Sequence, residues 1–404
     1  MEAMVFIFEH PHLFEAIKEY AEFHKVVIIN KASRTDRQEL RTVFDEFIEV
    51  GDIHDDSEVD RAVAGIVNQR KITAIYGSYE SAIEIAGRLR SKFNIAGMTE
   101  EETLKVRNKA LMKTVMRQNG IPTADFTVVN TMSDRLRLLA KLKKPMVVKP
   151  IDGAATKHTC KIDGFRELFK ADALKALFRH KTILAEAFVD GEEYHCDSIV
   201  VNGKIIFSSV SKYFCNCLNA LNSEAPWGSI CYPTSYDSDD VISNIKNLNE
   251  RAVRALNIQN SVCHLEAFVD KQGNVTFGEI AARIGGSPMI PEAVKNTYGV
   301  DLHKAFVDLE MHNYRHQYNP KPVFTGWASF PSRRGTVAEI SSEADYANIE
   351  GLVNVKILNK IGDRLNMRKN TSIRSGYIVM EDTDCERLIR KISDACGRFQ
   401  LKVK

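Results

Sequence analysis

The chain has 404 residues, of which 44% are hydrophobic and 27% charged, and its formal net charge is +2 at pH 7. This length allows two or three domains, and the composition is typical of a globular protein. A net charge so close to zero creates no global field for nucleic acid or a membrane surface, so neither is expected as a partner. The sequence shows no signal peptide and no apolar run near the roughly 18 residues of a membrane span. The eight cysteines are scattered without a CxxC pair, so we expect reduced thiols and a cytoplasmic location.

Residues 1–97 alternate between strand and helix patterns. The strand-like runs are VFIFEH, KVVIIN and ITAIYGS, and the helical runs are PHLFEAIKEYAEFH, RAVAGIVNQR and YESAIEIAGRLRSKF. This alternation predicts a small parallel sheet that is covered on both faces. The first strand-to-helix turn, EHPHLF, has no G-x-G-x-x-G, so dinucleotide binding is not expected here.

A charge-rich helix is expected next. Thr99 and Glu102 form a capping box at its start, and Gly120 ends it. The basic residues along it are Lys105, Arg107, Lys109 and Lys113. Such a helix is most often simply solvated, so its lysines alone indicate little.

The segment PMVVKPIDGAAT combines a lysine with a loop of small residues. PMVVKP is predicted to be an edge-like strand, and Lys149 within it needs an anionic partner. The loop Asp152-Gly153-Ala154-Ala155-Thr156 follows, and small residues let backbone N–H groups approach a phosphate closely. The pattern differs from a Walker loop because the lysine precedes it. A tight hairpin with a lysine at the strand end is the alternative.

The next segments read as successive strands. Glu186 lies in the apolar run ILAEAFV, and Glu193 follows it seven positions later, after the turn Asp190-Gly191. Residues 211–233 are predicted to form a polar, aromatic and irregular loop, and loops of that length in a compact domain are usually functional or mobile.

The stretch Val262–Gly286 is the most informative part of the chain. Glu266 and Glu279 each lie in a short apolar run, and the turn sequence DKQGN separates them. Two strands joined there would place both carboxylates near one spot on one sheet face. Two such carboxylates repel unless a cation lies between them, and Mg²⁺ suits oxygen ligands. Arg283, four positions after Glu279, is placed to bind a phosphoryl or carboxylate group. On this segment alone, an ordinary hairpin with solvent-facing glutamates is an equal alternative.

Residues 318–404 are predicted to form a small α+β unit. The runs PKPVFTGWASFPSRRGTVAEIS, VNVKILNKIGDRL and IRSGYIVMED suggest short antiparallel strands, and TDCERLIRKISDACGRF suggests a helix.

The order of these parts resembles the ATP-grasp superfamily: helix lysine, strand lysine, small-residue loop, E-x6-E, then paired glutamates and an arginine. The run EIAARIGG looks most like the dipeptide-forming (bacilysin-synthetase-like) L-amino-acid ligases, and the C-terminal run resembles the biotin carboxylase branch. The resemblance implies a mixed α/β and α+β architecture with three domains. These are an N-terminal Rossmann-like (pre-ATP-grasp) parallel-sheet domain over residues 1–97, an ATP-grasp domain over 98–317 with a mobile lid at about 122–185, and a C-terminal α+β domain over 318–404.

The resemblance also implies roles for particular residues. Lys109 and Lys149 would hold the phosphates of ATP, and the loop of Gly153, Ala154, Ala155 and Thr156 would close over them. Glu186 would mark the hinge, where the backbone of Ala187 and Val189 would contact the adenine. Glu193 would form hydrogen bonds with the ribose hydroxyls. Glu266 and Glu279 would hold Mg²⁺, with Mn²⁺ as an alternative ion, and Arg283 would be the catalytic residue that stabilises the acyl phosphate. The expected substrate-binding residues are His264, Arg283, Gly286, Ser287 and Met289, although a packed histidine and ordinary loop residues are the alternatives for His264, Ser287 and Met289.

Two positions depart from the family pattern. Many members carry Asn two positions after the second glutamate, where this chain has Ala281, and the phosphate loop has His158 where glycine is common. Ala281 weakens the resemblance to D-alanine ligases and biotin carboxylases and suits the amino-acid ligases.

The sequence therefore predicts an ADP-forming carboxylate–amine ligase that uses ATP and Mg²⁺ and acts on small-molecule carboxylate and amine substrates. The alternatives are a bicarbonate-activating carboxylase of the same fold and a nucleotide-binding protein without turnover. The sequence leaves open whether the acceptor is an amino acid, another amine or a carrier-bound group, and a homodimer is suggested by the resemblance alone.

Overall fold

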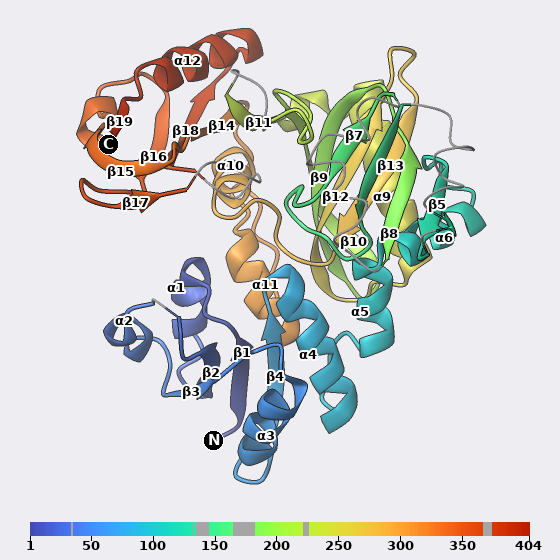
Figure 1. The fold of residues 1–404 in the computed structure, drawn as a ribbon, viewed down its shortest axis with the longest axis vertical. Helices are drawn as coiled ribbons and strands as arrows, with labels where there is room; N and C mark the ends of the chain where they lie inside the picture. The colour runs from blue at the N-terminus through green and yellow to red at the C-terminus, as the bar shows by residue number, and fades with distance from the viewer. Residues whose placement is uncertain (34, 132, 135–144, 165–181, 221–225, 367–373) are drawn as a thin grey trace.

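The computed structural model describes residues 1–404 except residues 34, 132, 135–144, 165–181, 221–225 and 367–373. Figure 1 shows three regions, with the N-terminal region (blue), the middle of the chain (green to yellow) and the C-terminal region (red) at different corners of the view. Helices α10 (Met289–Tyr298) and α11 (Leu302–Glu310) lie between them (Figure 1). Helix α11 packs against both the N-terminal sheet and the large central sheet.

The N-terminal region is a four-stranded parallel sheet in the order β3-β2-β1-β4. Its strands are β1 (Ala3–Ile7), β2 (His24–Asn30), β3 (Glu46–Val50) and β4 (Ile72–Gly77), and its helical segments are η1 (Pro11–Leu13), α1 (Phe14–Lys18), α2 (Arg37–Arg41), α3 (Asp56–Val67) and α4 (Glu80–Phe93). Every residue of β1 is buried, because Met4 and Phe6 belong to one core while Val5 and Ile7 belong to the other. The predicted parallel sheet with two covered faces is confirmed.

The charge-rich segment after residue 98 forms two helices, α5 (Glu100–Arg107) and α6 (Lys109–Gln118). The capping box of Thr99 and Glu102 is present, as predicted. The prediction of one continuous helix was wrong, because Asn108 has extended backbone angles and its side chain caps α6. Lys109 is therefore the first residue of α6 rather than a mid-helix residue.

A small antiparallel sheet follows, in the order β5-β8-β6-β7. Its strands are β5 (Phe126–Val129), β6 (Met146–Pro150), β7 (Cys160–Ile162) and β8 (Ile183–Ala187). Strand β6 pairs with strands on both sides, so the prediction that it is edge-like was wrong. This sheet spans the predicted lid at about 122–185, and residues 132, 135–144 and 165–181 of that range lie outside the described residues.

The largest sheet has the order β13-β12-β9-β10-β11-β14-β18-β16, and its neighbours pair antiparallel. Its strands are β9 (Glu192–Val201), β10 (Lys204–Tyr213), β11 (Trp227–Cys231), β12 (Ser261–Val269), β13 (Val275–Ala281), β14 (Phe324–Phe330), β16 (Leu352–Ile357) and β18 (Gly376–Asp382). The segment between β11 and β12 contains η3 (Thr234–Tyr236) and α9 (Asp240–Leu256). Residues 211–213 and 227–231 thus lie inside the sheet, so the prediction of an irregular loop over all of 211–233 was wrong; residues 221–225 lie outside the described residues.

The C-terminal region adds a three-stranded sheet in the order β17-β15-β19. Its elements are β15 (Gly335–Ile340), η4 (Glu343–Tyr346), β17 (Arg364–Leu365), α12 (Cys385–Gly397) and β19 (Leu401–Val403). The predicted short strands and final helix are confirmed. Because β14, β18 and β16 continue the central sheet, hydrogen bonding crosses the proposed boundary at residue 318, and that boundary stays a prediction.

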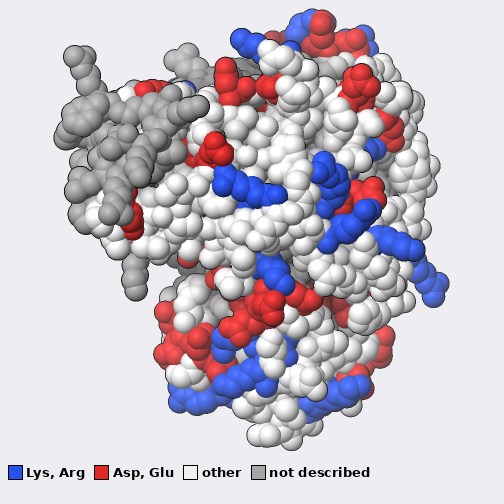
Figure 2. All heavy atoms as spheres, turned by 90° about the vertical axis from the view of Figure 1, so that its right-hand side faces the viewer, with Lys and Arg blue, Asp and Glu red and all other residues white. Residues whose placement is uncertain are grey.

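Charged side chains of both signs are interspersed over the face drawn in Figure 2, in agreement with the near-zero net charge. Among the described residues, no helix combines the length and the apolar character needed to cross a membrane.

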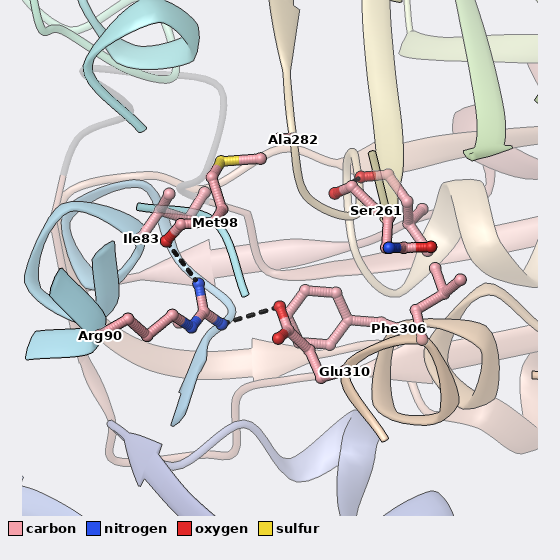
Figure 3. Close-up of a pocket in the computed structure, with 11 residues that line it drawn as sticks. Ile83, Arg90, Met98, Ser261, Ala282, Phe306 and Glu310 are labelled. Atoms are coloured by element: carbon pink, nitrogen blue, oxygen red, sulfur yellow. Dashed lines mark hydrogen bonds and ion pairs between the residues drawn. The ribbon is translucent and has the colours of Figure 1, made fainter. Parts of the chain in front are cut away.

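One buried ion pair holds the N-terminal region to α11. Arg90 of α4 is 4% exposed and its Nη2 lies 2.7 Å from Glu310 Oε1. Its guanidinium also donates to the carbonyl oxygens of Ile75 and Met98, and Figure 3 shows it reaching between Met98 and Glu310. The adjoining cavity is only about 20 Å³, which is room for about one water. The Arg90–Glu310 pair and the small cavity beside it therefore have a structural role.

Arg90→Met should lower the free energy of unfolding by about 3 kcal/mol, because it leaves Glu310 buried without its cation. Lys92→Met is the matched control on the same helix; its side chain is 51% exposed, and the expected loss is below about 1 kcal/mol. Chemical denaturation measures both. Equal losses in the two variants would show that Arg90 does not secure this junction.

Candidate active site

A cleft of about 920 Å³ lies among the small β5–β8 sheet, the β9, β12 and β13 end of the central sheet, and the loops that follow β1 and β4. Every residue that the sequence analysis proposed for ATP, metal or substrate lines this one cleft. They come from segments far apart in the chain, so the fold brings them together as predicted. Their individual roles stay predictions.

The two glutamates of the β12–β13 hairpin face each other. Glu266 is the direct cross-strand partner of Glu279, and His195 of β9 is the partner of Glu266 on its other side. The strand pairing is irregular just after Glu266, where a bulge changes the direction of the strand. The predicted placement of both carboxylates at one spot is confirmed.

Three lysines converge on two of the carboxylates. Lys149 Nζ lies 2.6 Å from Glu186 Oε1, and Lys113 Nζ lies 3.1 Å from Glu186 Oε2. Lys109 Nζ lies 3.2 Å from Glu279 Oε2. Burial would raise the pKa of Glu186, but the two ammonium groups outweigh it and lower that pKa to about 2. Lys149 thus has the anionic partner that its apolar strand requires.

Lys113 is a site residue that the sequence analysis did not select. Its side chain is almost completely buried, and burial lowers its pKa although Glu186 acts in the opposite direction. It lies one helical turn after Lys109, so both lysines share one face of α6. That spacing was the signal that could have identified it.

The small-residue loop is anchored to the start of α6. Lys109 Nζ donates to the carbonyl oxygen of Gly153 at 2.6 Å, and Arg107 Nη2 donates to that of Asp152 at 2.8 Å. Ala155, Thr156 and His158 have φ values of 52°, 58° and 57°, a left-handed region that costs non-glycine residues energy. The loop follows a strained path without glycines at those three positions, which suits a segment that must lie close to a ligand.

Arg283 is held by the N-terminal region. Its Nε donates to Glu80 Oε1 at 2.8 Å, and Glu80 also pairs with Arg107. Glu80 begins α4, directly after the turn that follows β4, and it is 203 residues from Arg283. No spacing in the sequence could have identified Glu80, because tertiary packing of α4 against α5 and of the N-terminal sheet against α11 brings it here.

A buried polar network lies behind Glu266. His264 Nδ1 lies 2.9 Å from Asp197 Oδ1, and His264 Nε2 lies 3.5 Å from Glu266 Oε1. His195 contacts Asp197 at 2.6 Å and Ser229 at 2.8 Å. Burial disfavours the imidazolium of His264, but Asp197 outweighs it and raises the pKa of His264 to about 10. The ring of His264 thus lies between Asp197 and Glu266, where it can orient the Glu266 carboxylate.

Two small residues lie next to His264. A Cβ on Gly285 would lie 2.2 Å from His264 Nδ1, so glycine is required there. Ala281, the position that carries Asn in many ATP-grasp proteins, is the cross-strand partner of His264. The alternating polar residues of His195 and Asp197 in a buried strand were a signal for this network that the sequence analysis did not use.

Glu193 lies beside Glu266 and is 4% exposed. Burial first, and the charge of Glu266 second, raise the pKa of Glu193 to about 8, although it accepts a hydrogen bond from the amide of Cys217 at 2.7 Å. This mutual repulsion of carboxylates would be relieved by a divalent cation, and oxygen donors suit Mg²⁺. Cys217 lies with Glu193 and Glu266 in one cluster, and burial raises the pKa of its thiol well above its usual value. The donor set thus fits a hard cation.

The remaining predicted residues lie at two ends of the cleft. The amide of Ala187 already donates to the carbonyl oxygen of Asp125 at 2.7 Å, so an adenine contact at Ala187 would use another backbone group. At the other end, Ser287 Oγ lies 2.9 Å from His303 Nε2, and Met289 is buried at the start of α10.

Glu80→Gln should reduce the dependence of stability on pH. Burial would raise the pKa of Glu80, but Arg283 and Arg107 lower it from 4.5 to about 2. Because the folded-state pKa is the lower one, this contribution is full above about pH 4.5 and is lost as the pH falls toward 2. The difference corresponds to on the order of 3 kcal/mol. Thermal unfolding at a series of pH values measures it.

The matched control for Glu80→Gln is Glu22→Gln, which alters an exposed carboxylate of the same region. An unchanged pH profile in Glu80→Gln would contradict the assignment of Glu80 as the common partner of the two arginines.

The comparisons with known proteins agree with this geometry. A family model described as an ATP-grasp domain matches residues 142–290. The L-arginine-specific L-amino acid ligase of Bacillus subtilis is 29% identical over 80% of this chain and 78% of its own length. The crystal structure of an L-amino acid ligase from Bacillus licheniformis superimposes with a TM-score of 0.83 and 19% identity, covering 100% of this chain and 99% of that one.

A more distant fold relative was crystallised with nucleotide. The biotin carboxylase domain of the Hydrogenobacter thermophilus 2-oxoglutarate carboxylase, solved with MgADP and bicarbonate, has a TM-score of 0.72 and 16% identity, covering 100% of this chain and 91% of that one. The paired glutamates, the lysines of the cleft, the family model and the shared fold lead to one conclusion: residues 142–290 belong to an ATP-grasp domain, and the whole chain has the ATP-grasp fold.

Proposed function

We propose that this protein is an ATP- and Mg²⁺-dependent amino-acid ligase that activates one carboxylate as an acyl phosphate, couples it to an amine, and releases ADP and phosphate. The observation that carries this proposal is the convergence of Glu266, Glu279 and Arg283 with Lys109 and Lys149 in one cleft. The similarity to L-amino acid ligases over most of the chain supports it.

Phosphoryl transfer depends mainly on positioning and on neutralisation of charge. Lys109 and Lys149 hold the phosphates of ATP, and the backbone of the Gly153–Thr156 loop covers them. Glu266 and Glu279 would hold the divalent ion, which would offset the charge of the phosphates. The carboxylate of the first substrate attacks the γ-phosphorus, and ADP leaves.

Arg283 acts on the product of that step. Its guanidinium, oriented by Glu80, stabilises the acyl phosphate and the oxyanion that forms when the amine attacks its carbonyl carbon. Burial would lower the pKa of Arg283, but Glu80 outweighs it and raises that pKa, so the residue stays charged throughout. The tetrahedral intermediate then expels phosphate, which carries away the proton lost by the amine, and leaves an amide.

Water must be excluded because it would hydrolyse the acyl phosphate. The small sheet that carries Lys149 and the loop borders the cleft on one side. We assign the lid function to this unit, about residues 122–185, whose movement would close the cleft.

The other lining residues have proposed roles in binding. Glu186 and the backbone near Ala187 and Val189 form the adenine end, and Glu193 contacts the ribose or, given its position beside Glu266, the metal. His264 with Gly286, Ser287 and Met289 borders the substrate end. We also propose a cytoplasmic location, because ligation requires a supply of ATP, and we keep the homodimer as a prediction to be checked by sizing.

The test of this function is the release of ADP and phosphate with Mg-ATP and a panel of single and paired L-amino acids, arginine included. Release that requires an amino-acid pair, together with a condensed product by mass spectrometry, is the expected result. A separate arm contains bicarbonate, and release with bicarbonate alone would replace the ligase by a carboxylase. Binding of ATP without release in any arm would contradict an amino-acid ligase.

Glu279→Gln should lower kcat by about 100-fold or more while the fold remains intact, because a neutral amide oxygen holds the divalent ion much more weakly than a carboxylate does. The Michaelis constant for Mg²⁺ should rise in the same variant. The rate of ADP release measures the first effect, and a thermal unfolding curve checks the fold.

Glu250→Gln, an exposed carboxylate on α9, serves as the control and should retain wild-type activity. Full activity in Glu279→Gln would refute the metal assignment.

A further inference from the structure

Three histidines gather at the substrate end of the cleft. His10 and His12 belong to the turn after β1 and line the cleft, and His303 belongs to α11. The ring centroids of His10 and His12 lie 5.7 Å apart, and those rings lie 6.0 and 5.7 Å from His303. His303 Nε2 also contacts Ser287 Oγ at 2.9 Å. None of these imidazoles has a part in the mechanism given above.

The buried Nδ1 atom of His10 has no hydrogen-bond partner among the described residues. The residue is only 6% exposed. Leaving a buried polar atom unpaired costs free energy, so native structures rarely do it without reason. Because His10 lines the cleft, a bound molecule is the partner that would satisfy this nitrogen.

The cluster offers neutral acceptors rather than cations. Burial lowers the pKa of His10 to about 3 and that of His303 to about 4, against the opposing charge of Asp301 for His303. The groups that face these rings are Tyr79, beside His10 at 4.9 Å, and the cations of Arg374 near His12 and Lys295 near His303. A neutral imidazole has one nitrogen lone pair that accepts a hydrogen bond, and an ammonium group has only hydrogens to donate.

Arg374 supplies a cation at the same place. It lines the cleft, and its Nη2 donates to the carbonyl oxygen of Ser287 at 3.3 Å. A guanidinium presents several donors in one plane, which matches the two oxygens of a carboxylate. The cluster and Arg374 together therefore match the two charged ends of a zwitterion.

We propose that His10, His12, His303, Ser287 and Arg374 form the subsite of the amine-contributing substrate, and that this substrate is a free zwitterionic amino acid. His10 and His12, which line the cleft, accept hydrogen bonds from its ammonium group, His303 orients the hydroxyl of Ser287 beside them, and Arg374 pairs with the carboxylate that is not activated. A carrier-bound acceptor lacks that carboxylate and could not make this contact with Arg374. This inference rests on the proposed ligase function.

The position of the subsite fits this assignment. Tyr79 contacts His10, and the next residue, Glu80, binds Arg283. A continuous line of contacts thus connects the cluster to the arginine that stabilises the acyl phosphate.

Two different nucleophiles can test binding at this subsite independently of the activation of the carboxylate. Hydroxylamine traps an acyl phosphate as a hydroxamate and has no carboxylate, so it reports carboxylate activation alone, whereas an amino acid acceptor also requires the subsite. In His10→Phe, which keeps a ring but removes the nitrogen lone pairs, the KM for the acceptor should rise about tenfold or more while hydroxamate formation stays unchanged. His10→Asn places an oxygen where Nδ1 stood and should restore most of the affinity.

Arg374→Gln provides an independent measurement. The wild-type protein should prefer an acceptor amino acid over its α-amide, which lacks the carboxylate, by about tenfold or more in kcat/KM, and the variant should lose that preference. Hydroxamate formation should again stay unchanged.

The outcomes are distinct for the two proposals. Equal loss of hydroxamate and peptide in both variants, or equal use of the acid and the amide by the wild-type protein, would overturn the subsite while leaving the ligase function intact. Absence of hydroxamate with every carboxylate in the wild-type protein would overturn the proposed function and the subsite with it.

Discussion

The site depends on the mutual neutralisation of charged side chains that are mostly shielded from solvent. Glu186 is neutralised by Lys113 and Lys149, and Glu80 by Arg283 and Arg107. Each partner would be expensive to bury alone, because an ion without a counter-ion in a low-dielectric interior is strongly destabilised. The same ions that stabilise one another in the absence of ligand are those that a triphosphate and a divalent cation would engage, so binding exchanges one set of ion pairs for another.

This charge balance requires that distant parts of the chain be correctly packed. Glu80 follows a strand of the N-terminal sheet, Lys149 lies on the small antiparallel sheet, and Arg283 follows the central hairpin. Helix α11 connects the first and last of these regions, and the buried Arg90–Glu310 pair secures the contact. A weakened junction would therefore release Arg283 from its carboxylate as well as lowering stability, which links the packing of the domains to the chemistry.

Much of the central site followed from local sequence rules. The opposition of Glu266 and Glu279 follows from two apolar runs, a turn sequence and the two-residue period of a strand. The parallel N-terminal sheet followed from the alternation of strands and helices. These features are encoded within short windows, so a single sequence is enough to predict them.

The features that were missed depend on longer-range contacts. Glu80 reaches Arg283 only through tertiary packing. Asn108 can either cap a new helix or lie within a continuous one, so the sequence alone does not predict the break between α5 and α6. Whether β6 lies at an edge or inside its sheet depends on β7 and β8, which pair with it from later in the chain. His10 and His303 are far apart in sequence, so their cluster could not be inferred from spacing.

The central claim is that a carboxylate is phosphorylated before the amine attacks it, and transfer of an oxygen atom tests this claim most directly. The protein would be supplied with Mg-ATP, an amine acceptor, and a carboxylate substrate labelled with ¹⁸O in both carboxylate oxygens. The account predicts that the released phosphate carries one ¹⁸O atom, seen as a shifted ³¹P resonance, and that the new amide retains the other. Turnover that releases phosphate without ¹⁸O would contradict the acyl phosphate, and with it the roles assigned to Arg283 and the paired glutamates.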